Sequence, residues 1–242
     1  MKSKTRWSAQ LMGVLLCALG LKLYYSAASP DELRWILAPT AWLVETLSGR
    51  TFSFEAHAGY MSSDHTFLIA ASCAGVNFLI TSFLMLSIRH LWQQKFEHLS
   101  WRFLPITALA AYATTLAANT TRICLALRTQ GLRTEISLLT ANQIHRAEGI
   151  LVYFGFLLVL YLATGKQKLE KRVLIFPLLI YYVTTLGVPL LNGAYKQGLE
   201  FWEHSAFVMG IPLLVLGAIM SGNLISRLCF SSLRLHEWRK SV

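Results

Sequence analysis

Charge is scarce in this sequence. Charged residues make up 14% of the 242 positions, and only 12 residues are acidic. A soluble domain carries roughly a quarter charged residues. Apolar residues account for 55% of the chain and gather in long runs. The lack of charge therefore argues against a soluble domain and predicts an integral membrane protein.

Several common functional motifs are also missing. The chain has no Walker sequence, no glycine-rich phosphate loop and no internal repeat. The four cysteines form no C-x-x-C pair, which argues against a zinc site or a dithiol redox centre. The seven histidines show no metal-ligand spacing, so we expect neither a metal nor a cofactor. Although the net charge is +10, basic residues in membrane proteins mark cytoplasmic loops, and we expect no nucleic-acid partner.

The apolar runs predict about six transmembrane helices. A helix needs roughly 20 apolar residues to cross a bilayer core of about 30 Å. Runs of this kind lie at Trp7–Ala27, Phe67–Trp92, Phe103–Leu127, Arg146–Thr164, Val173–Leu191 and Ser205–Ser226. The expected fold class is an all-α integral membrane bundle, in a single polytopic domain over residues 1–242.

One apolar stretch, Leu33–Ser48, is too short to assign as a span from its length. If it does not span, four inner segments hold 14 of the 22 basic residues: 1–6, 89–102, 165–172 and 227–242. A seventh span would separate the first two segments, against the positive-inside rule. We therefore expect six spans with both chain ends in the cytoplasm, and Leu33–Ser48 as an external amphipathic or re-entrant helix. The polar and aromatic stretch Thr51–His65 predicts a short external hairpin.

The N-terminal segment has two interpretations. Basic residues, an apolar run and then Ser26-Ala27-Ala28 resemble a signal peptide with its cleavage site. Lys22, Tyr24 and Tyr25 interrupt the small residues expected before such a site. The sequence favours a retained anchor helix and leaves cleavage open.

Three residues of the predicted bundle fall at one depth. On the expected topology, Cys73, Arg122 and His145 lie in the outer third of the bilayer, where ionisable groups are costly and commonly functional. Cysteine attacks as a thiolate, and a histidine can take its proton and later return it to a leaving amine. An arginine stays charged and can stabilise the oxyanion formed on attack at an amide. The set predicts a cysteine nucleophile, a general acid/base and an oxyanion donor.

A structural or binding role remains open for the same residues. Arg122 could extend towards the lipid headgroups, and His145 could be a solvated residue of the interface. A small transporter or anionic-lipid-binding protein would use Arg122 and His145 but would give Cys73 no task. A non-catalytic membrane scaffold would need none of the three.

Other polar residues in the predicted spans have less certain roles. Glu148 could orient the His145 ring or pair with Arg146. Asn77 lies four residues after Cys73, on the same face of a helix, and could hold a carbonyl group. Asn77 and Asn119 are also typical helix-packing residues. Lys22 is expected to pair with a carboxylate or to extend to the interface.

The order of cysteine, arginine and histidine resembles the exosortase/archaeosortase family. The matching stretches are Ala71-Ser-Cys73-Ala-Gly-Val-Asn77, Ala118-Asn-Thr-Thr-Arg122-Ile and His145-Arg-Ala-Glu-Gly149, within about residues 60–165. The compact N-terminal region looks most like the exosortase K branch. Many members carry Ser-Gly after the cysteine, where Ala74 and Gly75 stand here, and this departure bears on substrate contacts. The last two spans, over 173–226, lie outside the matched region.

The resemblance implies a multi-pass enzyme of the bacterial inner membrane whose active site faces the periplasm. Its substrates would be exported proteins with a C-terminal sorting signal, made of a short motif, a membrane helix and a basic tail. Membrane lipids would be its other partners. By this resemblance Cys73 is the acyl-enzyme nucleophile, Arg122 the oxyanion or carbonyl clamp and His145 the general acid/base. The acyl group would then pass to an amine, a hydroxyl or water.

Overall fold

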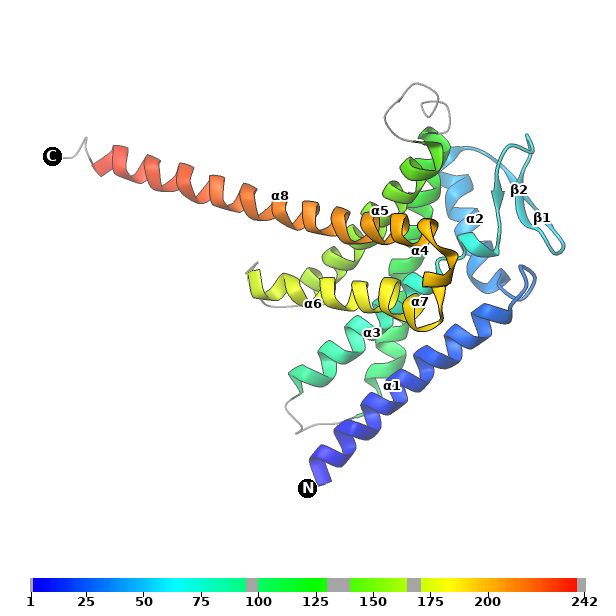
Figure 1. Ribbon diagram of the computed structural model, residues 1–242, viewed down its shortest axis with the longest axis horizontal. Coiled ribbons are helices and arrows are strands. Elements are labelled where there is room, and N and C mark those ends of the chain that lie inside the picture. The colour runs from blue at the N-terminus through cyan, green and yellow to red at the C-terminus, as the bar shows by residue number, and fades with distance from the viewer. Residues whose placement is uncertain (1, 95–99, 130–139, 165–170, 239–242) are drawn as a thin grey trace.

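The structure, a computed structural model, describes residues 2–94, 100–129, 140–164 and 171–238. These residues form a mostly helical molecule with one small sheet (Figure 1). The helices are α1 (Lys2–Ala27), α2 (Arg34–Ser48), α3 (Val76–Gln93), α4 (Phe103–Thr129), α5 (Ala141–Ala163), α6 (Lys171–Tyr182), α7 (Val188–Leu191) and α8 (Leu199–Trp238). The strands are β1 (Phe52–Glu55), β2 (Gly59–Ser62) and β3 (Leu68–Ile69).

Within the described part of the chain, five helical segments are long and apolar enough to cross a membrane. They are Thr5–Ala27, Ala71–Gln93, Asn142–Ala163, Leu174–Leu191 and Leu199–Ser221. The five segments are compatible with a multi-pass membrane protein. The predicted span Phe103–Leu127 is present as α4, about 40 Å long at 1.5 Å per residue. It is not among the five because its threonines and Asn119 lower its hydropathy.

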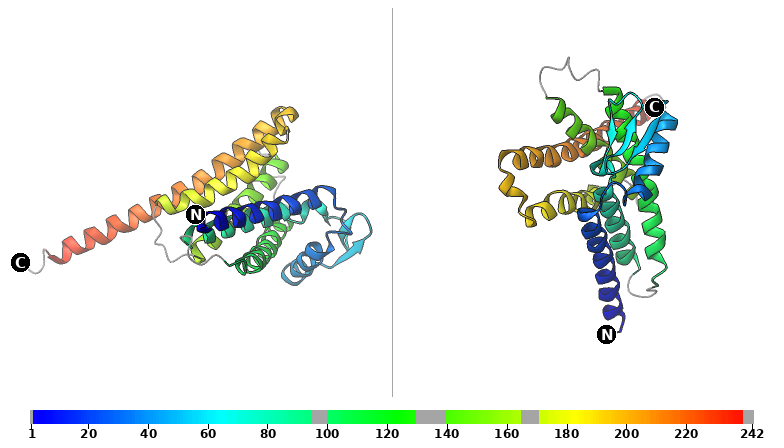
Figure 2. Two further views of the ribbon diagram at one scale, coloured as in Figure 1. Left: turned by 90° about the horizontal axis from the view of Figure 1, so that it is seen from below. Right: turned by 90° about the vertical axis from the view of Figure 1, so that its right-hand side faces the viewer.

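Helix α3 occupies the centre of the bundle and packs against α1, α4, α5 and α6 (Figures 1 and 2). Helix α1 runs antiparallel to it. The indole N–H of Trp7 donates to the carbonyl of Leu91 at 3.3 Å, near the end of α3. At the other end, the Tyr25 hydroxyl donates to the carbonyl of Ala71 at 3.4 Å. This pairing brings the C-terminal end of α1 beside the turn that contains Cys73.

The predicted helix Phe67–Trp92 is wrong over its first residues. Leu68–Ile69 is strand β3, which pairs antiparallel with β2 in a sheet of order β1-β2-β3. A single 3-10 turn, Ala71–Cys73, follows, and the α-helix begins only at Val76. The apolar run Phe67–Ile69 has no periodicity that separates a strand from a helix, and the pairing with β2 decides it. The hairpin predicted within Thr51–His65 is confirmed as β1 and β2.

A helix is present over most of the predicted stretch Leu33–Ser48, as α2, which packs on α4 and is capped by Gly49 in the left-handed conformation. Its external position stays a prediction. The predicted span Val173–Leu191 is interrupted by a π-helical segment, Val183–Gly187, between α6 and α7. The predicted span Ser205–Ser226 lies within α8, a single helix of 40 residues, and overlaps its apolar segment Leu199–Ser221.

Helices α6 and α8 lie side by side, and the C-terminal part of α8 extends beyond the rest of the bundle (Figures 1 and 2). Parts of the predicted inner segments, namely 1, 95–99, 165–170 and 239–242, lie outside the described residues.

Candidate active site

A cavity of about 300 Å³ lies where α3 begins, α4 ends and α5 begins. Cys73, Arg122 and His145 all line it. The remaining lining residues are Thr66, Phe67, Leu68, Ile123, Ala126 and Asn142. The three residues that the sequence predicts as a set therefore share one cavity, although they come from three separate segments of the chain.

The turn before α3 presents Cys73 to this cavity. The backbone N–H of Cys73 donates to the carbonyl of Ala70 at 2.8 Å, which closes the turn. Gly75 follows with a φ of +71°, a conformation that side chains other than glycine rarely adopt. A Cβ at Gly75 would also lie 3.3 Å from the side chains of Asn119 and Thr115. Gly75 therefore lets the chain turn sharply into α3 while it packs closely on α4.

Cys73 was predicted about two turns inside a regular helix, and this placement is wrong. It lies ahead of α3, so the four-residue spacing to Asn77 does not put the two side chains on one helix face. The exposed Asn77 side chain instead accepts a hydrogen bond from Lys22 Nζ at 2.8 Å. Lys22 thus contacts an amide and the Tyr25 ring, whose centroid is 5.7 Å away, whereas the sequence predicts a carboxylate partner or extension to the interface.

Asn119 holds the Cys73 turn from α4. Its side-chain N–H donates to the backbone carbonyl of Cys73, and its Oδ1 accepts a hydrogen bond from the Tyr153 hydroxyl at 2.9 Å. Asn119 is fully buried. The Tyr153 ring in turn stacks on Phe78, with ring centroids 4.9 Å apart. Residues of α3, α4 and α5 therefore fix the backbone of the cysteine together.

Arg122 makes the direct contact with the thiol. Its Nη2 donates to Cys73 Sγ at 3.7 Å, a distance that suits a hydrogen bond to sulfur. The guanidinium carbon lies 5.6 Å from the centroid of the Tyr153 ring, which is a cation–π distance. A Cβ at Gly149 would lie 3.6 Å from the Arg122 side chain, so α5 closely approaches the arginine here. A permanent positive charge beside the sulfur stabilises negative charge on it.

His145 enters the cavity from the second turn of α5. A capping box of Thr140 and Gln143 fixes where this helix begins. His145 Nδ1 lies 4.0 Å from Glu148 Oε2, a distance over which charges attract but which is too long for a hydrogen bond. The imidazole is 42% exposed, so it remains accessible from the cavity side.

Glu148 and Glu203 are two carboxylates near the start of α5. Arg146 pairs with Glu203 of α8, 3.6 Å away, and the Gln143 amide also donates to Glu203 at 2.9 Å. Glu148 is the carboxylate beside the His145 ring. The Arg146 pair therefore ties the start of α5 to α8, and Glu148 places a negative charge near the His145 ring.

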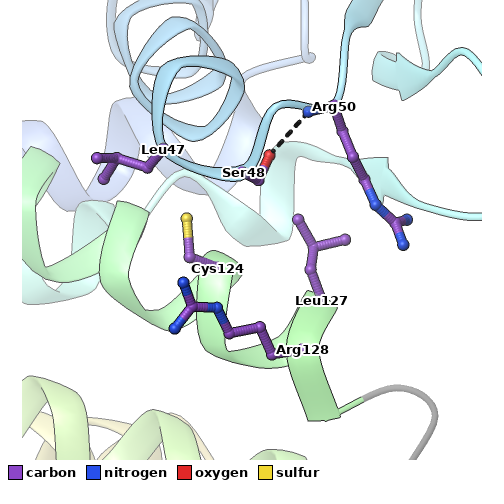
Figure 3. Close-up of a pocket in the computed structure, with 6 residues that line it drawn as sticks. All are labelled: Leu47, Ser48, Arg50, Cys124, Leu127 and Arg128. Atoms are coloured by element: carbon purple, nitrogen blue, oxygen red, sulfur yellow. Dashed lines mark hydrogen bonds between the residues drawn. The ribbon is translucent and has the colours of Figure 1, made fainter.

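A second cavity, of about 170 Å³, lies between the C-terminal ends of α2 and α4 (Figure 3). The thiol of Cys124 points towards α2 there, while the Arg50 side chain points away from it (Figure 3). The full lining is Leu47, Ser48, Arg50, Cys124, Leu127 and Arg128. Among these described residues there is no histidine to serve as a base, so the Cys124 cavity lacks the set found around Cys73.

Tyr153 and the Thr66–Leu68 segment were not predicted as parts of the site. Tyr153 lies eight residues after His145, a spacing that recurs on one face of a helix, and this signal could have identified it. No sequence signal places Thr66–Leu68 beside Cys73, because a strand pairing brings it there. Protein-family models, curated proteins and solved structures were compared with the chain, and none of them matches it.

Proposed function

We propose that this protein is a membrane-embedded cysteine transpeptidase or protease. The observation that carries the proposal is one cavity lined by Cys73, Arg122 and His145, with Arg122 Nη2 3.7 Å from the sulfur. The resemblance of these three motifs to the exosortase/archaeosortase family supplies the substrate class. The substrates would be exported proteins with a C-terminal motif, a membrane helix and a basic tail.

The chemistry follows from the three side chains. His145 takes the thiol proton, and the sulfur of Cys73 attacks the carbonyl carbon of the scissile amide. The resulting oxyanion is stabilised by the Arg122 guanidinium. The C–N bond then breaks, His145 gives its proton to the leaving amine, and a thioester remains on Cys73. An amine, a hydroxyl or water attacks the thioester, releases the acyl group and restores the thiol.

The neighbours of the three residues support these roles. His145 lines the same cavity as the thiol, and the Glu148 carboxylate lies 4.0 Å from its Nδ1, where it would stabilise a protonated imidazole. Asn119 and Tyr153 keep the Cys73 backbone in place during attack. The proposal also includes a bacterial inner-membrane location, with α4 as the sixth span, α2 on the outer side and the cavity open to the periplasm.

The proposal predicts that Cys73→Ala abolishes cleavage of a co-expressed protein carrying a C-terminal sorting signal. The loss is expected to be complete because the thioester cannot form without the sulfur. Cleavage is measured from the mass of the product in membrane fractions. Cys124→Ala is the matched control, because this thiol lines the other cavity and should leave cleavage at the wild-type level.

Two outcomes would contradict the proposal. Normal cleavage by Cys73→Ala would show that the sulfur is not the nucleophile. Unchanged function after alkylation of Cys73, together with loss of anionic-lipid binding in Arg122→Gln, would favour the transporter or lipid-binding alternative.

A further inference from the structure

Strand β3 is one of the two outer strands of the small sheet, and it lies at the cavity. The sheet order β1-β2-β3 leaves one side of β3 without a neighbouring strand of this sheet. Leu68 and the two residues before it line the cavity, as does Cys73 five residues later. The sheet edge and the proposed nucleophile therefore face the same space.

The register of the ladder shows which backbone groups point outward. The N–H of Ser62 donates to the carbonyl of Phe67 at 2.9 Å, and the N–H of Phe67 donates to the Ser62 hydroxyl at 2.9 Å, so both backbone groups of Phe67 face β2. Hydrogen-bonded and non-hydrogen-bonded pairs alternate along an antiparallel ladder. Leu68, opposite Met61, is therefore non-hydrogen-bonded, and its N–H and C=O point away from β2.

The position of Gly59 supports this register independently. A Cβ placed on Gly59 would come within 2.4 Å of the Ile69 carbonyl oxygen, so that carbonyl faces β2. The carbonyl groups of adjacent strand residues point in opposite directions. The carbonyl of Leu68 consequently faces the outer edge of the sheet, and Leu68 is one of the residues that line the cavity.

We propose that the outer edge of β3 binds the substrate as an extended peptide strand, with the backbone of Leu68 as its hydrogen-bonding partner. An extended peptide that adds to a sheet edge gains main-chain hydrogen bonds irrespective of its side chains. The occupant is the segment that contains the scissile amide, since the edge shares its cavity with Cys73. This inference rests on the proposed function and adds the conformation in which the substrate is held.

The test uses a probe of defined chemistry, acetyl-Ala-Ala-Ala chloromethyl ketone, on the full-length protein in detergent. The Cys73 sulfur displaces chloride from this probe and forms a thioether, which mass spectrometry locates and quantifies. Three analogues each carry one N-methylated amide and so lose one backbone donor. We expect at least one analogue to alkylate Cys73 about threefold to tenfold more slowly than the parent, as loss of one hydrogen bond predicts. Cys124 should react equally with all four probes.

A pair of variants tests the enzyme side of the same contact. Leu68→Pro removes the N–H that points outward and leaves the ladder to β2 intact, because that N–H is not used there. Phe67, the residue before it, keeps its two hydrogen bonds with Ser62, because neither of them uses the N–H of Leu68. Leu68→Ala shortens the side chain and keeps the N–H. We expect the parent probe to alkylate Cys73 about threefold to tenfold more slowly in Leu68→Pro than in Leu68→Ala. Iodoacetamide, which has no peptide backbone, should alkylate Cys73 at equal rates in the two variants.

Equal rates for the parent and all three analogues would overturn the edge-strand inference, as would equal probe rates in the two Leu68 variants. Such a result would leave the proposed function standing if Cys73→Ala still abolishes cleavage. Cleavage by Cys73→Ala would instead remove the proposed function, whatever the probes show.

Discussion

At the scale of single residues, Asn119 connects the proposed nucleophile to the rest of the bundle. Its amide joins the Cys73 carbonyl to the Tyr153 hydroxyl, and it is fully buried. A buried polar group that loses its partner costs about 1–3 kcal/mol. Asn119 contacts the backbone of the cysteine and not its sulfur, so it is a positioning residue.

We expect Asn119→Ala to lower the alkylation rate of Cys73 by about tenfold, because the freed carbonyl lets the turn move away from Arg122. Tyr153→Phe should have a smaller effect, since it keeps the bond from Asn119 to Cys73 and the stack on Phe78. The iodoacetamide rate at Cys73 across pH, beside the thermal unfolding temperature in detergent, measures both effects.

The matched control is Thr121→Ala, an exposed α4 residue whose hydroxyl bonds only within its own helix in the described structure. A lower unfolding temperature with an unchanged pH–rate profile in Asn119→Ala would show a purely structural role and contradict this assignment.

At the scale of elements, the sequence predicts the long helices better than it predicts the segment from β3 to the start of α3. The long apolar runs predict α1, α4 and α5 to within a few residues, and the pattern of Thr51–His65 predicts the hairpin. The start of α3 could not be predicted, because the left-handed Gly75 and the pairing of β3 depend on contacts with α4 and β2. The set of Cys73, Arg122 and His145 could be proposed from the sequence because the expected topology places all three residues near helix ends at the same depth in the membrane. The spacing of Tyr153 from His145 places it on the same face of α5, but its hydrogen bond to Asn119 depends on helix packing that the sequence does not show.

The turn between β2 and β3 is held by Asp64. Its carboxylate accepts hydrogen bonds from the Ser62 hydroxyl at 2.6 Å and the Thr66 N–H at 3.2 Å, and Arg50 lies 3.5 Å away. The Ser62 hydrogen bond first, then those from Thr66, lower the pKa of Asp64 to about 2. Because the folded pKa is depressed, the contribution to stability is present above about pH 4 and is lost as pH falls towards 2.

We therefore expect the turn that carries Thr66 into the cavity to loosen between about pH 4 and pH 2. Hydrogen exchange of the peptide covering residues 62–69, corrected for intrinsic rates, measures the opening. Asp64→Asn cannot ionise, so its corrected exchange should stay the same across this range and match that of the wild type at the acid end. A pH-independent wild type would contradict the prediction.

At the scale of the whole molecule, the positive-inside rule and the packing of α1 on α3 together predict an orientation. Trp7 bonds to the end of α3 and Tyr25 to the turn before it, so the basic N-terminus and the Cys73 cavity lie at opposite ends of α1. The inner segments predicted from the sequence hold 14 of the 22 basic residues. The extent of α8 could not be predicted, because the basic residues after Ser226 are typical of a tail as well as of a helix.

The orientation predicts which surface positions are reachable from outside the cell. In a background without the four natural cysteines, Ala56→Cys in the β1–β2 turn should react with a membrane-impermeant maleimide in intact spheroplasts. Ser100→Cys, before α4, should react only after permeabilisation, because 89–102 is an inner segment by the positive-inside rule. Both positions are exposed and both replace a small side chain, so accessibility to the reagent differs only through the membrane. Labelling of Ser100→Cys in intact spheroplasts, with Ala56→Cys protected, would show that the bundle has the opposite orientation. The cavity would then open to the cytoplasm, and exported proteins would be excluded as its substrates.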